Sequence, residues 1–245
     1  MAVSDLPVKR ILPLFYLLLS SFVLAQDQNI SRSVILIIDA GHGGSDSGAK
    51  NPEAGLTEKD LALGVAQRLE KSLRQEKKLT VILTRTGDID LPLYARAEKA
   101  NKAKGHLLLS LHTAYDLRAD SAGPRVYFCS LENFTARLSA QVGSFSKSLP
   151  ELTPWDESQI PFINESNDLA LLLQNRLNPI FLSDRSIQTS PLLLLQFSAM
   201  PAVLVELGNL SDPADVWRLK GAEALEQMNQ ALKSSVLEFL SSLTR

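Results

Sequence analysis

The chain has 245 residues and a formal net charge of −2, from 25 basic and 27 acidic side chains. This length suits one domain with a substantial core, and the slightly acidic balance without a basic cluster excludes a nucleic-acid-binding protein. The only cysteine, Cys129, excludes an internal disulfide and is typical of a small buried apolar group rather than a nucleophile.

Residues 1–25 differ in character from the rest. Lys9 and Arg10 precede an apolar run over residues 11–24 that ends in a small-x-Ala cleavage pattern, which predicts a secretory signal peptide. An uncleaved membrane anchor is the alternative, but the run is shorter than the roughly 20 residues that a spanning helix needs. We expect a signal peptide, then one folded domain over 26–245, export to the periplasm or the extracellular cell wall, and no stable membrane insertion after cleavage.

Apolar runs with the length and composition of strands recur along the chain. They cover residues 34–39, 79–85, 106–112, 125–130, 192–197 and 202–207. Helical patterns separate most of them, and this alternation indicates a parallel sheet covered on both faces. We therefore predict a single α/β domain with a twisted, mostly parallel (mixed) sheet of about six strands and helices on both faces.

Two helices are predicted in the first half of the chain. One begins at a Thr57-x-x-Asp60 capping pattern. Its apolar positions share one stripe: Leu61, Val65, Leu69 and Leu73. The other covers residues 91–104 and places four apolar residues inward: Leu93, Ala97, Ala100 and Ala103.

The second half of the chain is also mostly helical. Residues 131–190 are predicted to be a helical insertion with a regulatory role or, as we prefer, an ordinary helix pair packed on the sheet. Asp212 before Pro213 predicts a capped helix that stops at Gly221, and a final amphipathic helix runs to residue 243.

A histidine framed by glycines follows the first predicted strand. Functional groups in such sheets follow the carboxyl ends of the strands. Gly41, Gly43 and Gly44 are expected to let the backbone turn and to leave space beside the His42 ring. Taken alone, His42 is a metal ligand, a catalytic base or an ordinary loop histidine.

Three other groups occupy similar places. Glu58 opens the first helix, His112 ends the run over 106–112, and Glu206 lies inside the run over 202–207. Alone, Glu58 would only favour the helix dipole. Two histidines and one carboxylate suit a catalytic zinc with an open position. Glu206, expected to be partly desolvated, has the raised pKa that a proton-transfer group needs.

With these groups, the chain resembles the zinc-dependent N-acetylmuramoyl-L-alanine amidases of the amidase type 3 family. The segments that carry the resemblance are 38–44, 55–60, 83–85, 95–101, 109–112 and 200–211. It implies that His42, Glu58 and His112 bind one Zn²⁺ and that Glu206 is the catalytic general base and acid. It also implies that the substrate is peptidoglycan, cut between N-acetylmuramic acid and L-alanine of the stem peptide.

The chain departs from the family pattern at three places. Thr113-Ala114 stand where the family usually has Ala-Asn, which affects substrate placement more than zinc binding. Arg185 is kept within an altered motif and is expected to pair with a substrate carboxylate. Asn209 stands where phenylalanine is common, which predicts a more polar floor of the site.

In some relatives a helix blocks the zinc until an activator protein moves it. In residues 131–190, Glu151, Glu157 and Glu165 are candidates to reach the open metal position in that way. An activator protein is therefore a second expected partner besides peptidoglycan.

Three other functions compete with hydrolysis of the amide bond. A phosphate or dinucleotide binder is disfavoured, because the glycine loop lacks both the P-loop and the G-x-G-x-x-G spacing. A non-catalytic peptidoglycan-binding protein on the same fold, and a zinc peptidase that acts elsewhere in the stem peptide, stay open. Glu206 argues against the pure binder, which needs no proton-transfer group.

Overall fold

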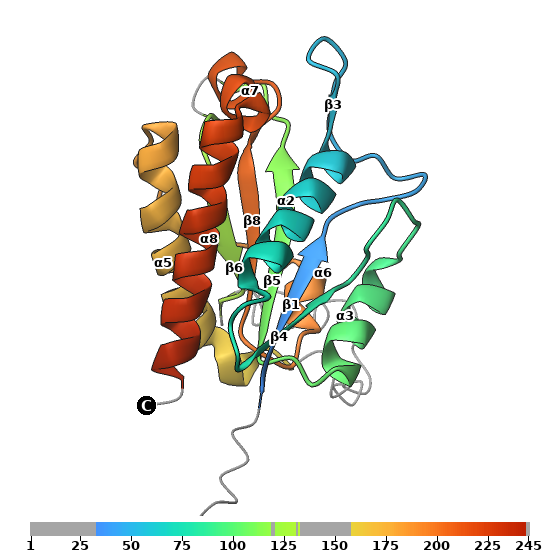
Figure 1. The fold of residues 1–245 in the computed structure, drawn as a ribbon, viewed down its shortest axis with the longest axis vertical. Coiled ribbons are helices and arrows are strands. Elements are labelled where there is room, and N and C mark those ends of the chain that lie inside the picture. The colour runs from blue at the N-terminus through green and yellow to red at the C-terminus, as the bar shows by residue number, and fades with distance from the viewer. Residues whose placement is uncertain (1–32, 119–120, 131, 133–157, 244–245) are drawn as a thin grey trace, which may run out of the picture. The chain divides into compact units, whose positions relative to one another are not determined.

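One mixed sheet forms the centre of the fold. The computed structural model describes residues 33–118, 121–130, 132 and 158–243. In it the strands are β4 (Leu79–Leu83), β1 (Val34–Ala40), β5 (Leu107–Ala114), β8 (Ala202–Asn209), β6 (Arg125–Phe128) and β7 (Gln188–Thr189), in that spatial order. The first four are parallel (Figure 1). Strand β6 runs antiparallel to β8, and β7 runs parallel to β6. The mostly parallel, mixed sheet is confirmed.

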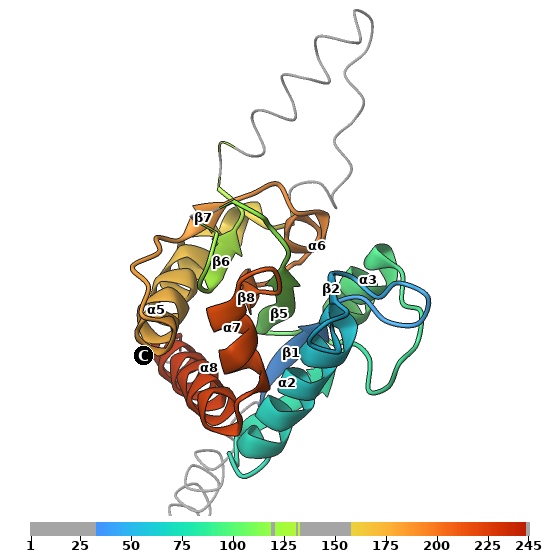
Figure 2. The ribbon, with the colours of Figure 1, turned by 90° about the horizontal axis from the view of Figure 1, so that it is seen from above.

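Helices cover both faces of this sheet, as predicted (Figure 2). One face carries α2 (Glu58–Leu73), α5 (Ile163–Phe181) and α8 (Ala222–Ser242), and the other carries α3 (Leu93–Lys102) and the short α6 (Leu193–Gln196). Successive strand residues point to opposite faces, so that Leu36 and Ile38 pack under the first layer and Ile37 under the second. Helix α7 (Pro213–Lys220), a 3-10 helix (Ile160–Phe162) and a small hairpin of β2 (Lys50–Asn51) and β3 (Leu56–Thr57) complete the described elements.

The predicted starts of α2 and α7 are confirmed. The Thr57 side chain accepts a hydrogen bond from the Asp60 amide at the start of α2, and Asp212 accepts one from the Asp215 amide at the start of α7. Each cap satisfies an amide that would otherwise lack a partner. Gly221 separates α7 from α8, as predicted.

Two details of the prediction are wrong. Residues 192–197 do not form a strand, because Leu193–Gln196 is helix α6. A run of consecutive leucines has no period that separates a strand from a buried helix, and leucine favours the helix. The sixth strand is the exposed two-residue β7, which carries no apolar signal. Leu93, which was predicted to face inward, is the first residue of α3 and is 43% exposed.

The predicted signal peptide over residues 1–25, and Glu151 and Glu157, lie outside the described residues. Within the predicted 131–190 insertion, α5 packs on the sheet, with Leu169, Leu173 and Leu177 fully buried in the core. This part of the segment is a layer of the domain. Among the described residues, no helix has both the length and the apolar character needed to cross a membrane.

Candidate active site

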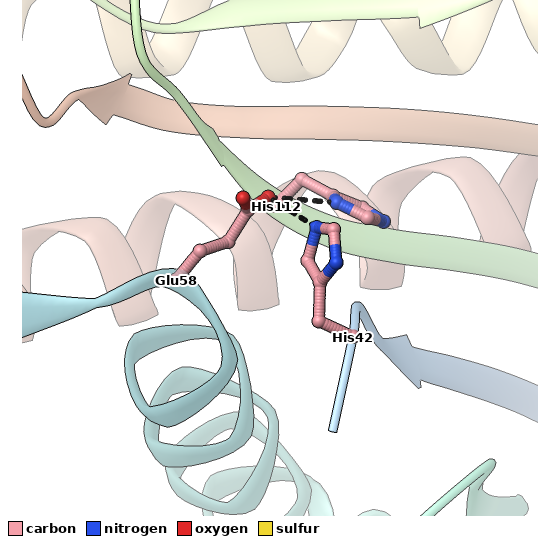
Figure 3. A group of neighbouring side chains, drawn as sticks. All are labelled: His42, Glu58 and His112. Carbon is pink, nitrogen blue, oxygen red and sulfur yellow. Dashed lines mark hydrogen bonds and ion pairs between the residues drawn. The ribbon is translucent and has the colours of Figure 1, made fainter. Parts of the chain in front are cut away.

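The three predicted metal ligands meet at one edge of the sheet. His42 follows β1, His112 lies near the end of β5, and Glu58 is the first residue of α2. Glu58 Oε1 lies 3.0 Å from His42 Nε2 and 2.8 Å from His112 Nδ1 (Figure 3). One ligand atom from each residue lies within 4.8 Å of the others. The parallel strands bring together residues far apart in the sequence, as expected for this edge.

Neighbouring groups orient each ligand. Asp46 Oδ2 lies 2.7 Å from His42 Nδ1, which directs Nε2 of the same ring toward Glu58. The amides of Ala49 and Thr113 donate to Glu58 Oε2 and Oε1, at 2.8 and 3.0 Å. A carboxylate on the far nitrogen of a histidine is the usual support of a metal-bound imidazole. Asp46 was not among the predicted site residues, although its place four residues after His42 was a usable signal.

The electrostatics also suit a cation. Burial would raise the pKa of Glu58, but hydrogen bonds with His112 and His42 outweigh it and lower that pKa well below its usual range. The hydrogen bond with Glu58 raises the pKa of His42, against the effect of burial. An ionised carboxylate between two imidazoles is a donor set that fits Zn²⁺ with an open fourth position.

Glycines leave room for the ligands, though not the glycines predicted. A methyl group on Gly41 would lie 2.4 Å from His112 Cε1, so Gly41 clears His112 rather than His42. The His42 ring is cleared by Gly48, where a methyl group would lie 2.6 Å from its Cδ2 atom. His42 itself has φ of 57°, a left-handed conformation that is uncommon outside glycine.

Gly41→Ala is expected to weaken zinc affinity by about 10–100-fold, as the loss of an outer-shell partner does, because the added methyl group displaces the His112 ring. Titration of the metal-free protein with zinc against a chromophoric chelator measures the change. Gly64→Ala is the matched control, since a methyl group there meets no atom within 4 Å. Equal affinity of Gly41→Ala and Gly64→Ala would contradict the clearance argument.

The predicted proton-transfer residue lies beside this cluster. Glu206 of β8 is in register with His112 of β5. Tyr127 Oη donates to Glu206 Oε2 at 3.2 Å, and Arg125 Nη1 lies 3.6 Å from the same oxygen. Burial raises the pKa of Glu206, against the opposing effects of Arg125 and Tyr127. The partial desolvation expected from the sequence is confirmed.

Other predicted residues lie elsewhere. Arg185 Nε and Nη2 donate to the Ala122 carbonyl at 2.9 and 2.8 Å, and its contact with substrate stays a prediction. Asn209 is buried, and its amide group bonds with Asp116 and Ser121 of the loop after β5. The Asn209 side chain therefore holds the loop after β5 in place, and it does not by itself make the floor of the site polar. Cys129 is fully buried, and burial raises its pKa to about 12.

A cleft of about 640 Å³ adjoins His42 and His112 on the side of α3 and α6. Its walls are largely apolar and include Leu91, Pro92 and Leu193. Its polar lining residues include Asp39, Asp46, Asp90 and Arg96. Two of the three metal ligands, His42 and His112, thus line a cleft whose volume suits a ligand of several residues or rings.

Comparisons with known proteins identify relatives of this chain. Residues 36–238 match the family model described as N-acetylmuramoyl-L-alanine amidase. The chain is 27% identical over 224 residues to the amidase AmiC of Escherichia coli, covering 86% of this chain and 54% of that protein. It is 28% identical over 208 residues to AmiA of Salmonella typhimurium, covering 79% of this chain and 71% of the relative. The chain therefore spans about half the length of AmiC.

Solved structures show the same fold. An amidase from Clostridium difficile 630 matches with a TM-score of 0.68 and 25% identity, covering 86% of this chain and 98% of the other. The catalytic domain of the amidase CwlV from Paenibacillus polymyxa matches with a TM-score of 0.66 and 25% identity, covering 85% and 98%. The chain belongs to the N-acetylmuramoyl-L-alanine amidase family, Amidase_3.

Proposed function

We propose that this protein is a zinc-dependent peptidoglycan hydrolase that cleaves the amide bond between the lactyl group of N-acetylmuramic acid and L-alanine of the stem peptide. The observation that supports it most is the His42–Glu58–His112 cluster with Glu206 in register beside it. Family membership and the adjoining cleft agree with this proposal.

His42, Glu58 and His112 would hold a Zn²⁺, which when bound would act as a Lewis acid toward the scissile carbonyl and would lower the pKa of a water molecule to ~7. Glu206 accepts a proton from that water, whose oxygen attacks the lactyl carbonyl carbon. Because Tyr127 Oη donates a hydrogen bond to Glu206 Oε2, the other oxygen, Oε1, is the one that accepts the proton. The C–N bond then breaks, and Glu206 delivers the proton to the alanine nitrogen. The products are a lactyl carboxylate and a stem peptide with a free amine.

Digestion of peptidoglycan by the purified protein, with and without a chelator, tests this function. We expect intact stem peptides with a free L-alanine amine, and their loss on chelation. Cleavage elsewhere in the stem would favour the zinc peptidase. Binding without cleavage by a zinc-loaded chain would favour the non-catalytic peptidoglycan-binding protein. The reason to test for it is that Thr113-Ala114 replace the family's usual Ala-Asn.

The pH dependence should reflect the burial of Glu206. Since the ionised form accepts the proton and burial raises its pKa, activity is expected to fall with decreasing pH from a point above the usual range of a glutamate. In Arg125→Gln this acid limb should move to still higher pH, because the lost cation favoured the carboxylate. Profiles of kcat/KM against pH, which report the ionisation of the free enzyme, measure this shift.

Arg118→Gln is the control for this experiment, because Arg118 pairs with Asp116 and belongs to the loop after β5. An acid limb that stays in place or moves to lower pH in Arg125→Gln would contradict the assignment of Glu206 as the titrating group.

We also propose export, with cleavage of residues 1–25 and action in the periplasm or cell wall. Sequencing of the N-terminus of the protein from the envelope fraction tests this, and Gln26 is the expected first residue. An activator protein is proposed as a partner. Full activity of the purified chain alone would argue against this partner.

A further inference from the structure

Two arginines are buried directly under the candidate metal centre, and the proposed reaction uses neither. Arg85, which follows β4, is 1% exposed, and Arg96 of α3 is 5% exposed. Buried arginines are rare unless their donors are satisfied. Their partners here are mostly backbone carbonyls of the segments that carry the metal ligands.

Arg96 holds the segment of His42. Its Nη2 atom donates to the His42 carbonyl at 2.6 Å, and its Nη1 atom donates to the Ala40 carbonyl at 2.6 Å. Nη1 also pairs with Asp39 at 2.8 Å, and Nε donates to the Leu91 carbonyl at 3.0 Å. These bonds fix the backbone on both sides of Gly41, including His42 in its left-handed conformation.

Arg85 connects that segment to the helix that carries Glu58. Its Nε atom donates to the Ala40 carbonyl at 2.9 Å. Its Nη2 atom donates both to the Gly41 carbonyl at 2.7 Å and to the Lys59 carbonyl at 2.8 Å. Since Gly41 precedes His42 and Lys59 follows Glu58, one guanidinium nitrogen joins the neighbours of two metal ligands.

We propose that Arg85 and Arg96 form a carbonyl clamp that holds the His42 and Glu58 segments in their metal-binding arrangement before a metal enters. They are positioning residues. A planar guanidinium presents five donors in a rigid fork, and a lysine ammonium cannot reach the same set of carbonyls. The inference rests on the proposed metal centre and not on the reaction proposed for it.

Arg96→Lys and Arg85→Lys test the clamp. Arg96→Lys keeps a positive charge beside the buried Asp39, and so separates charge compensation from the holding of carbonyls. A single Arg96→Gln variant would leave the Asp39 charge buried without its partner and could unfold the protein. The double variant Asp39→Asn/Arg96→Gln removes both charges and avoids this problem. Arg218→Gln is the matched control, because Arg218 is also largely buried and donates to a carbonyl, that of Ile180, at 3.0 Å.

The readouts are the zinc affinity of the metal-free protein, measured against a chromophoric chelator, and the thermal unfolding midpoint without metal. Both lysine variants and the double variant are expected to fold and to bind zinc about 10–100-fold more weakly, as for the loss of other outer-shell partners. Arg218→Gln should lower the midpoint and leave zinc affinity unchanged.

Wild-type affinity in the lysine variants would overturn the clamp while leaving the proposed function intact. The clamp would also be overturned if zinc affinity fell in proportion to the unfolding midpoint in every variant, Arg218→Gln included. A wild-type chain that binds no zinc would overturn the clamp and the proposed function together.

Discussion

Glu206→Gln is expected to lower kcat by about 10²–10⁴-fold or more while the chain keeps its zinc, because the amide cannot accept the proton of the attacking water. Glutamine has nearly the same shape, so the packing between β5 and β6 should persist. Metal analysis of the purified variant and single-turnover digestion of peptidoglycan provide the two measurements.

A loss of stability is the main competing explanation for a low rate. Without the carboxylate, Arg125 loses its ion pair with Glu206 in a largely buried position, which costs on the order of 1–3 kcal/mol. Thermal unfolding of the variant measures this cost, and assays well below its midpoint remove the effect. A Glu206→Gln protein that hydrolyses peptidoglycan at the wild-type rate would show that another group moves the proton.

Tyr127→Phe separates orientation from proton transfer at the same site. The variant removes the hydroxyl that donates to Glu206 Oε2 and leaves the carboxylate. Its kcat should therefore lie between those of the wild type and Glu206→Gln.

The metal ligands and Glu206 were predictable because each is marked by local sequence. A buried parallel strand ends at a known edge, and a capping pattern fixes the start of a helix to within a residue. The sequence alone thus assigned His42, His112 and Glu58 to the edge of the sheet at the carboxyl ends of its parallel strands.

The partners of these residues were less predictable, because they depend on strand order. Arg125 and Tyr127 reach Glu206 only because β6 runs antiparallel beside β8, and no local pattern states this pairing. The same holds for Arg96, which lies 57 residues from Asp39 in the sequence and forms a buried ion pair with it. Arg96, Arg125 and Tyr127 are thus placed by strand order, whereas the metal ligands, and Asp46 four residues after His42, carry a local signal.

His42→Ala is expected to abolish zinc binding at stoichiometric metal and all chelator-sensitive activity. Structural zinc sites with four ligands contribute about 10–16 kcal/mol, so one ligand contributes roughly 2.5–4 kcal/mol, or roughly 10²–10³-fold in affinity. The variant leaves only Glu58 and His112, and two ligands do not make a catalytic zinc site. Zinc titration and peptidoglycan digestion measure the two losses.

His106→Gln provides the matched control, because His106 accepts a hydrogen bond from the Ile35 amide at the opposite end of β5. It should keep both zinc and activity. Asp46→Asn should fall between the two, with about 10–100-fold weaker zinc binding, because it keeps the ring of His42 and weakens only the group that orients it. Normal zinc affinity in His42→Ala would mean that the metal, if one binds, is held by other residues, and the assignment of this cluster would then be wrong.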